Sequence, residues 1–531
     1  MSAQPCVVCT DLRFAWPDGA MVVDHLSTTF GGGRNGLVGV NGSGKSTLLR
    51  LIAGELAPSA GSVTVRGSLG FLHQDAALEA SLRVDEALGI AQIRTALRAV
   101  EAGESAEQLF AAIGDDWDVE ERARATLDRL GLDGVGLDRR IGQLSGGQAV
   151  LLQLAAQLLR SPDVLLLDEP TNNLDLAARA RLYQAVDDWR GSLVVVSHDR
   201  GLLRRMDQIG DLRSGEIRWY GGDWDDYVAA VAAEQEGAER EVRNAAADLR
   251  RQRREQAEAQ TRIERRARQG QKVQDSGSLP KILAGRRKRG AQVSAGKERT
   301  LHQARVEAAR ERLDERETQL REDREIRIDL PDTTVPAGRT VLSLEGLRTR
   351  YDEAIDRAPL DLELRGPERV CLAGPNSSGK STLLETIAGR LPASAGRVRA
   401  QVPLRYLPQR LDVLDPRSSV VQNVAAFAPD ATANEVRARL ARFLFRGRRA
   451  DQLVETLSGG ERFRATLAAL LLAEPAPQLL LLDEPTNNLD LAGVAELVSA
   501  LTAYRGALVV ASHDPEFLAG IGITRQLDLS G

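Results

Sequence analysis

A glycine-rich stretch from Gly39 to Thr47 constrains the fold of this 531-residue chain more than any other feature. It reads GVNGSGKST and fits the pattern G-x-x-x-x-G-K-[ST]. A strand-like apolar run, 36–38, leads into it, and a helical pattern, 48–52, follows it. In that context the glycines let backbone N–H groups surround phosphate oxygens at the positive end of a helix. The stretch therefore predicts a nucleotide-phosphate site.

Two side chains of this loop have specific expected roles. Lys45 is expected to reach the β- and γ-phosphates, and Ser46 to supply a hydroxyl group to Mg²⁺. An aromatic side chain at the edge of such a site is suited to stacking on adenine. Trp16 is the candidate for that role, although a surface or core aromatic residue explains it equally well. The other expected nucleotide contacts in the loop are Gly39, Asn41, Gly42, Ser43, Gly44 and Thr47.

The loop occurs twice, and three further motifs are duplicated with it. The second loop spans Gly374 to Thr382. The further pairs are Leu144–Gln148 with Leu457–Glu461, Leu165–Asp175 with Leu480–Asp490, and Ser197–Asp199 with Ser512–Asp514. An internal repeat decides the architecture, so the chain is expected to hold two copies of one α/β domain. The second copy's expected nucleotide contacts are Gly374, Asn376, Ser377, Ser378, Gly379, Lys380, Ser381, Thr382 and Tyr351, with Ser381 also facing Mg²⁺.

The duplicated L-S-G-G motif precedes a helical run in each copy. Ser145, Gly146, Gly147 and Gln148 form it in the first copy, where a helix N-terminus and a serine hydroxyl together make an anion site. A second anion site in one domain is sensible if it faces the nucleotide of the other domain. The counterparts in the second copy are Ser458, Gly459, Gly460 and Glu461, and the change from Gln to Glu makes the two sites chemically unequal.

Two adjacent carboxylates end an apolar strand in each copy. Burying Asp168 and Glu169 after the strand 164–167 is costly unless a metal and a water use them. Asp168 is therefore expected on the metal side, and Glu169 as the general base or water-polarising group. His198 is expected to sense the γ-phosphate, and Gln74 either orients the attacking water or completes the Mg²⁺ shell. The counterparts in the second copy are Asp483, Glu484, His513 and Gln409.

Composition places the chain among ordinary globular proteins. Its hydrophobic content is 43% and its charged content 27%. The longest apolar runs stop short of the roughly 18 residues that span a membrane, and the N-terminus lacks the pattern of a secretion signal. Cys6 and Cys9 form a C-x-x-C without the second pair that a zinc site needs, so neither zinc nor an iron–sulfur cluster is expected. These features predict a cytoplasmic protein with no membrane partner.

A long charged segment separates the two copies. From Val228 the chain is rich in Ala, Arg, Glu and Gln, which predicts two antiparallel helices. Between Arg251 and Thr300, fifteen Arg and Lys stand against five Asp and Glu. Such an excess indicates a poly-anionic partner, and Arg suits recognition of both phosphates and bases. The residues expected to contact RNA lie at the basic tip: Lys281, Arg286, Arg287, Lys288 and Arg289. The apolar tip residues Leu279, Pro280, Ile282 and Leu283 either reach toward a drug site or pack the two helices together.

These patterns divide the chain into three expected parts. The first copy occupies 1–226, the charged helical linker 227–338, and the second copy 339–531. A short helical insertion is expected at about 76–140 of the first copy, and its section from Ala91 to Arg129 predicts a helical hairpin.

The phosphate loop, the L-S-G-G-[QE] motif, the Asp-Glu strand and the histidine together resemble those of ATP-binding cassette ATPases. The tandem layout, the charged linker and E-P-T-N-N-L-D in both copies resemble the ABC-F family of translation factors and ribosome-protection proteins. The resemblance implies an α/β fold with two P-loop ATP-binding cassette domains joined by a long α-helical hairpin linker. It also implies an ATP hydrolase that uses Mg²⁺ and is a monomer with an intramolecular cassette sandwich.

In that family two ATP molecules lie between head-to-tail cassettes. The resemblance implies that the first phosphate loop, with Gln74, Asp168, Glu169 and His198, faces 458–460, and that the second faces 145–147. It also implies a ribosome partner: binding at the exit (E) site, with the linker reaching ribosomal RNA and the P-site tRNA. A departure is Ser377, which stands where the first copy has Gly42 and requires a negative φ.

Three alternatives belong to other classes. The energy module of a transporter with separate membrane subunits has no use for a basic linker. A DNA-repair or chromosome-associated ATPase would carry zinc modules or a very long coiled coil, and a recycling ATPase with an iron–sulfur domain would need more cysteines than the three in this chain. Within the ABC-F family, the sequence leaves open antibiotic resistance and the general relief of stalled translation.

Overall fold

The computed structural model describes residues 6–74, 80–172, 174–213, 215–275, 296–297, 300–316, 330–350, 358–376, 378–409, 412–487 and 489–529. The chain divides into two compact units. One unit contains both repeat copies, Met1–Trp224 and Glu325–Gly531, and the other contains the intervening helical segment, Asp225–Arg324. We refer to the two copies as the first and second cassettes and to the helical unit as the arm.

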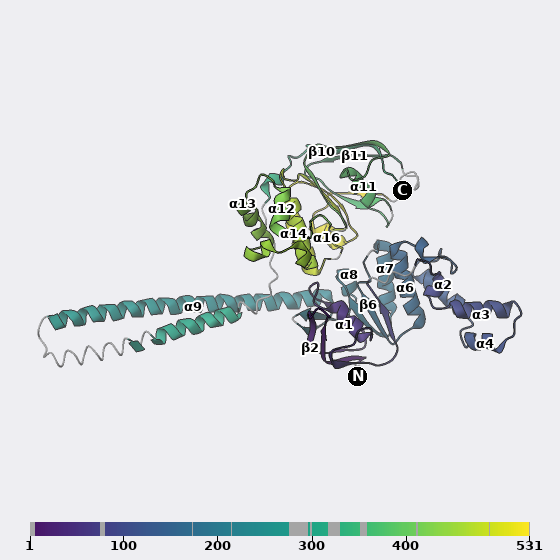
Figure 1. Cartoon of the computed structure of the whole chain (residues 1–531), viewed down its shortest axis with the longest axis horizontal. Helices are drawn as coiled ribbons and strands as arrows, with labels where there is room; N and C mark the ends of the chain where they lie inside the picture. The colour runs from purple at the N-terminus through teal and green to yellow at the C-terminus, as the bar shows by residue number, and fades with distance from the viewer. Residues whose placement is uncertain are drawn as a thin grey trace. The chain divides into compact units, whose positions relative to one another are not determined.

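A six-stranded sheet organises the first cassette (Figure 1), in the order β5-β6-β7-β3-β8-β9. Its strands from β5 to β8 are parallel, and β9 pairs with β8 in the antiparallel sense. All five residues of β6 and of β7 are buried, which is typical of parallel strands covered on both faces. The bounds are β5 Leu69–Leu72, β6 Val164–Asp168, β7 Ser192–Val196, β3 Arg34–Val38, β8 Gln208–Arg213 and β9 Glu216–Gly221.

A second, antiparallel sheet in the same cassette has the order β2-β1-β4, with β1 Val7–Ala15, β2 Met21–Phe30 and β4 Ala60–Val65. Its fully buried Phe30 joins Leu37 of the large sheet and Leu48 in one hydrophobic core. The main helices of the cassette are α1 (Lys45–Ile52), α6 (Gly146–Arg160), α7 (Leu176–Asp188) and α8 (Arg200–Leu203).

The insertion of the first cassette differs from the expected hairpin. After the short α2 (Val84–Ala87), the section from Ala91 to Arg129 forms three helices, α3 (Ala91–Glu101), α4 (Glu107–Ile113) and α5 (Val119–Arg129). Two glycines explain the extra break, because Gly103 and Gly114 have φ values of 96° and 53°, a left-handed region that ends a helix at low cost. Helices α3 and α4 alone form the hairpin, which projects from the sheet (Figure 1).

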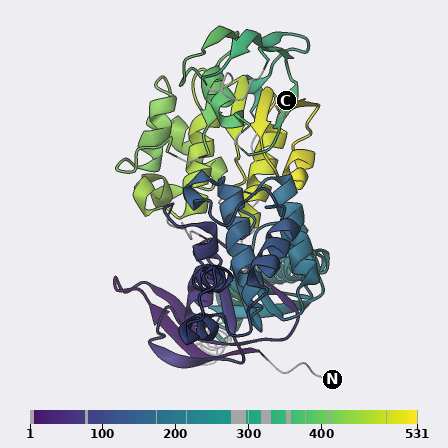
Figure 2. The same ribbon diagram turned by 90° about the vertical axis from the view of Figure 1, so that its right-hand side faces the viewer.

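The second cassette repeats this architecture. Its large sheet is wholly parallel, in the order β14-β15-β16-β12-β17, and its small sheet has the order β11-β10-β13. In Figure 2 the helices of this cassette, coloured green to yellow, flank its strands. The strands are β10 Thr340–Arg348, β11 Leu360–Arg365, β12 Arg369–Ala373, β13 Ala395–Ala400, β14 Leu404–Leu407, β15 Leu479–Asp483, β16 Ala507–Ala511 and β17 Arg525–Asp528. The helices are α11 Lys380–Ile387, α12 Val420–Phe427, α13 Ala433–Leu440, α14 Gly459–Leu471, α15 Leu491–Ala503 and α16 Pro515–Gly520. The predicted duplication of one α/β domain is confirmed.

The arm contains one very long helix, α9 (Trp224–Asp275), and a helical stretch at 300–316. Arg312 and Arg316 of that stretch pair with Asp248 and Glu241 of α9 at 3.2 and 3.0 Å, so the two helices run antiparallel. No helix in the described part of the chain is both long enough and apolar enough to cross a membrane. The tip residues of the RNA-contact prediction, Lys281, Arg286, Arg287, Lys288 and Arg289, lie outside the described residues.

Candidate functional site

Four neighbouring parallel strands deliver the predicted motifs to one edge of the sheet in each cassette. In the first cassette, β3 leads into the phosphate loop, β6 ends at Asp168, and β7 and β5 are followed by His198 and Gln74. The carboxyl ends of parallel strands form the ligand-binding edge of open α/β sheets. The second cassette places its loop, Asp483, His513 and Gln409 in the same way after β12, β15, β16 and β14.

The phosphate loop depends on glycine at two positions where a side chain does not fit. Gly44 is the N-cap of α1 with φ 95°, and a Cβ there would lie 2.7 Å from Val22. Gly39 has φ 154°, and a Cβ there would lie 2.5 Å from the carbonyl oxygen of Leu212. The loop therefore keeps its backbone N–H groups at the start of α1, where the helix dipole favours an anion.

The two loop lysines adopt the same arrangement. Lys45 is buried, and its Nζ donates to the carbonyl oxygens of Gly39 and Val40 at 2.8 and 3.1 Å. Lys380 donates to those of Gly374 and Pro375 at 2.8 and 3.0 Å. Burial lowers the pKa of both lysines, and the neighbouring carboxylates oppose that shift. Each ammonium is thus held inside its own loop, close to where phosphates would bind.

The residues beside each loop fit a magnesium–nucleotide complex. The Ser46 hydroxyl donates to Asp168 Oδ1 at 3.1 Å, and Tyr406 donates to Asp483 Oδ2 at 3.3 Å. Among the described residues, the buried oxygens here that have no hydrogen-bond partner include Oγ of Ser43 and Oδ1 of Asp483. Hydroxyl and carboxylate oxygens are the ligands that Mg²⁺ prefers, and buried polar atoms without partners are costly.

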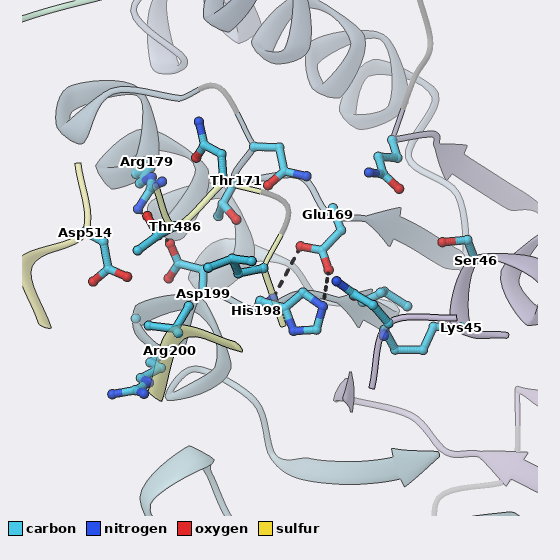
Figure 3. A pocket seen from close by; sticks show the side chains of 18 of the residues that line it. Lys45, Ser46, Glu169, Thr171, Arg179, His198, Asp199, Arg200, Thr486 and Asp514 are labelled. Carbon is cyan, nitrogen blue, oxygen red and sulfur yellow. Dashed lines mark hydrogen bonds and ion pairs between the residues drawn. The ribbon is translucent and has the colours of Figure 1, made fainter. Parts of the chain in front are cut away.

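Each glutamate that follows the strand carboxylate has a strained backbone and a side chain that is little exposed, 9% for Glu169 and 13% for Glu484. Glu169 and Glu484 have φ values of 47° and 44°, which non-glycine residues rarely adopt and which are typical of functional sites. Glu169 Oε1 lies 3.2 Å from Nε2 of His198, and Glu169 Oε2 accepts from the backbone N–H of the same histidine at 3.3 Å (Figure 3). In the second cassette the glutamate–histidine distance is 3.5 Å, and His513 Nε2 also lies 3.1 Å from Lys380 Nζ.

Burial moves the pKa of these groups toward their neutral forms. It raises the pKa of Glu169 to about 8 and that of Glu484 to about 7, with the loop lysines opposing and the strand aspartates reinforcing the shift. It lowers the pKa of His198 to about 3 and that of His513 to about 4. A carboxylate with a pKa near the working pH is suited to accept a proton from water, and a neutral imidazole beside it is suited to hydrogen bonding.

The two L-S-G-G motifs form capping boxes at the starts of α6 and α14. The Ser145 hydroxyl accepts from the backbone N–H of Gln148, whose side chain accepts from the backbone N–H of Ser145. In the second cassette Ser458 also donates its hydroxyl to Glu461 Oε2 at 2.9 Å. The box holds the serine at the helix N-terminus, and a carboxylate at Glu461 in place of an amide adds negative charge there.

Two cavities contain the phosphate loops. The first, about 720 Å³, is lined by Trp16, Gln74, Glu169 and most of the first loop, together with residues of the second cassette such as Asn487. The second, about 400 Å³, is lined by the second loop, Gln409, Asp483 and Glu484, together with residues 145–147 of the first cassette. The structure thus brings the second loop and Ser145-Gly146-Gly147 together. Among the described residues, 458–460 do not line the first cavity. Tyr351 and Ser377 lie outside the described residues.

Two aspartates that the sequence analysis did not single out link the cassettes. Asp490 Oδ1 caps α15, and its Oδ2 accepts from the backbone N–H of Asn41 in the first loop at 2.9 Å. In the same way, Asp175 Oδ1 caps α7, and Asp175 Oδ2 accepts from the backbone N–H of Asn376 in the second loop at 3.4 Å. The sequence could have indicated both aspartates, because each is the final residue of the duplicated E-P-T-N-N-L-D motif. Figure 3 shows Thr486 and Asp514 of the second cassette across the first cavity from Lys45 and Ser46.

The fold and the paired sites define a P-loop protein with two ATP-binding cassettes, and comparison with known proteins supports this. The sequence profile described as "ABC transporter" matches residues 24–172 and again residues 358–487. The tylosin resistance ATP-binding protein TlrC of Streptomyces fradiae is 33% identical over 94% of this chain and 92% of its own. The ATP-binding protein Uup of Haemophilus influenzae is 32% identical over 91% of this chain and 72% of its own.

This chain belongs to the ABC-F family of ATP-binding cassette proteins, and it is an ATP hydrolase of the P-loop type. A solved structure with a similar fold is that of the archaeal ribosome recycling factor aABCE1 in complex with the ribosomal stalk protein aP1. It matches with a TM-score of 0.54 at 19% identity, over 98% of this chain and 87% of its own. That similarity concerns the fold.

Proposed function

We propose that this protein is a cytoplasmic ABC-F ATPase that binds the E site of the ribosome and acts on translation. The observation that carries the proposal is the charge of the arm. Between residues 250 and 272, α9 carries nine Arg or Lys against three Glu, and all nine basic side chains are exposed. An exposed basic rod is suited to the RNA backbone, through charge and through bidentate arginine contacts.

ATP drives the cycle as a clamp in this proposal. Two ATP molecules join the cassettes, and hydrolysis removes the γ-phosphate contacts and lets the cassettes separate. ATP can shift that equilibrium only through contacts that the separated form lacks. The helix N-terminus at 145–147, which lines the cavity of the second loop, offers such contacts to a bound nucleotide. The corresponding N-terminus at 458–460 would have to move into the first cavity on closure.

The proposed roles at each site follow from position. Glu169 and Glu484 would polarise the attacking water, and His198 and His513 would respond to the γ-phosphate. Mg²⁺, which neutralises phosphate charge when bound, would be held by Ser46, Gln74 and Asp168 at one site and by Ser381, Gln409 and Asp483 at the other. Trp16 lines the first cavity and packs edge-on against Phe14 with ring centroids 5.1 Å apart, which leaves it suited to contact adenine.

Co-sedimentation with ribosomes tests the proposal. The double variant Glu169→Gln with Glu484→Gln should hydrolyse ATP at least 100-fold more slowly, as expected when a general base is lost, and should remain on ribosomes in the presence of ATP. Replacing Arg262, Arg265, Arg266 and Arg268 by Gln should weaken that retention and reduce its salt dependence. The matched control replaces Arg240 and Arg243, in the acidic half of α9, and should retain binding. Equal binding by the parent and the quadruple variant would disprove the role of the arm.

A resistance role is the second candidate, because the relative that is 33% identical over nearly the whole chain is named for tylosin resistance. Expression of this chain in a susceptible bacterium should then raise the inhibitory concentration of tylosin. The Glu169→Gln, Glu484→Gln double variant should not. An unchanged inhibitory concentration across ribosome-targeting drug classes would leave the general translation role as the remaining proposal.

A further inference from the structure

Arg179 occupies a position that belongs to both ATP sites. It lies on α7 of the first cassette, its side chain is 15% exposed, and it lines both cavities. Its Nε donates to the carbonyl oxygen of Leu174 at 3.2 Å, which fixes the guanidinium against its own loop. Its Nη1 lies 3.3 Å from Asp199 Oδ2 and donates to the carbonyl oxygen of His513 at 3.3 Å.

These contacts connect the two histidine loops. Asp199 directly follows His198, and His513 is the corresponding histidine of the second cassette. Figure 3 shows Arg179 and Asp199 on the same side of the first cavity. The arginine is therefore a direct bridge from the loop of one site to the loop of the other. A displacement of His513 also moves its contacts with Lys380 Nζ and Glu484, at 3.1 and 3.5 Å.

The second cassette has no arginine at the position equivalent to Arg179. The duplicated motifs align Asp175 with Asp490, so the second cassette has Val494 where the first has Arg179. Valine neither donates a hydrogen bond nor carries a charge. On the first-cassette side, Asp199 has further support, because it accepts from Tyr183 Oη at 2.6 Å and from the backbone N–H of Leu202 at 2.8 Å. Loss of Arg179 therefore affects the second histidine loop more than the first.

We propose that Arg179 couples the two ATP sites of one molecule, by tying the loop of His513 to the loop of His198. Hydrolysis at the second site then depends on the arrangement of the first. Arg179 is a positioning residue in this account, because it acts through the backbone of His513. The positive charge of Arg179 also acts on the side chain of His513. Burial lowers the pKa of His513 most, and the charges of Lys380 and Arg179 lower it further. The inference concerns the ATPase and is independent of ribosome binding.

The alternative explanation is that Arg179 only holds the two cassettes together and does not couple their ATP sites. Another ionic contact offers a comparison, because Arg200, the first residue of α8, and Arg204, which follows the helix, both pair with Glu516 of α16. Glu516→Gln weakens this contact without touching the bond to His513. Adhesion and coupling therefore predict different results for the two kinds of variant.

Steady-state ATP hydrolysis by the full chain, without ribosomes, tests the coupling. Arg179→Val, which introduces the residue found at the equivalent position of the second cassette, should lower kcat roughly tenfold, as expected for loss of a hydrogen bond from a charged group. The Hill coefficient for ATP should fall from above one to about one. The control Arg181→Val removes an exposed arginine from the same helix, and it should retain both values. Glu516→Gln should raise the KM but keep the Hill coefficient.

Arg179→Lys sharpens the test, because an ammonium keeps the charge but cannot make the forked contacts to Leu174, Asp199 and His513. We expect it to recover less than half of the lost cooperativity. The proposal is overturned by a parent Hill coefficient of one, by parent-like kinetics of Arg179→Val, or by an equal loss of cooperativity in Glu516→Gln. Thermal unfolding of each variant separates these outcomes from a folding defect, since Arg179→Val should melt within a few degrees of the parent.

Discussion

Glu169 combines two unfavourable features at one residue. Its backbone is left-handed and its carboxylate is buried beside Asp168, and each feature costs free energy. Glu484 repeats both features, so neither is an accident of one cassette. Strain of this kind persists only where the surrounding structure enforces it. Here the backbone N–H groups of Glu169 and Glu484 donate to the carbonyl oxygens of Val196 and Ala511, each at 2.8 Å. The position of the carboxylate is thereby set before any nucleotide binds.

The raised pKa of Glu169 gives a prediction about stability and pH. In the nucleotide-free protein, the native state binds more protons than the unfolded state between the unfolded pKa, near 4.5, and the native value of about 8. The group's contribution to stability is therefore lost as the pH rises through that window. The variant Glu169→Gln lacks this loss, so the difference in Tm between variant and parent should grow by roughly 4 °C from pH 7 to pH 8.5.

Calorimetry without nucleotide or Mg²⁺ measures this difference. The range above pH 7 is chosen because His198 and His513 are then largely neutral in both states. The depressed pKa of His198 removes stability only as the pH falls below the unfolded value of about 6.5. A Tm difference independent of pH over this range would contradict the placement of a protonatable carboxyl group in the site.

At the scale of elements, a buried arginine holds the helices of the insertion together. Arg94 of α3 has a side chain 5% exposed, and it donates to Asp85 of α2, to Glu120 of α5 and to Asp138. The distances are 2.9, 2.7 and 2.6 Å. Each of these carboxylates comes from a different stretch of chain, so the one guanidinium sets the directions of α3 and α5 relative to α2. The hairpin of α3 and α4 projects from this anchor.

Replacement of Arg94 should destabilise this cassette strongly. Arg94→Met leaves Asp85 buried with Arg83 as its remaining partner, and breaking a buried ion pair costs about 3–5 kcal/mol. Arg98→Met is the matched control, because Arg98 is 56% exposed and lies 3.5 Å from Asp138, and it should cost less than about 1 kcal/mol. Chemical denaturation of the two variants compares these values, and similar losses would show that the network contributes little.

At the scale of the whole molecule, Asp175 and Asp490 make the cassettes mutually dependent. Each aspartate begins a helix of its own cassette with one oxygen and accepts a loop N–H of the other cassette with the second oxygen. The same backbone N–H groups belong to the loops that surround phosphates. A change in either loop is therefore transmitted directly to the start of a helix in the opposite cassette.

Conservative variants separate the two functions of these aspartates. Asn is as good an N-cap as Asp, but it offers a single carbonyl oxygen. Asp490→Asn should therefore keep the Tm of the parent while weakening the bond to Asn41, which should raise the KM for ATP roughly threefold, as expected for a partly exposed hydrogen bond. Titration of ATPase activity and thermal unfolding measure the two effects. A lower Tm with an unchanged KM would assign Asp490 to capping alone.

The sequence by itself determined the two α/β cassettes and the residues at the edge of each sheet. Local rules suffice for this, because a glycine-rich loop between an apolar run and a helical pattern has one well-known structure, and duplication repeats it. The three-helix form of the insertion was missed, although the glycines that cause it, Gly103 and Gly114, are visible in the sequence.

Only the tertiary structure decided which residues of the two cassettes meet. Asn41 and Asp490 lie 449 positions apart, and Arg179 and His513 lie 334 positions apart, so no local periodicity relates them. The left-handed backbone of Glu169 was equally hidden, because it is imposed by a bond to the neighbouring strand rather than by its own residue type. Repeats specify what each half contains, and packing alone specifies where the halves meet.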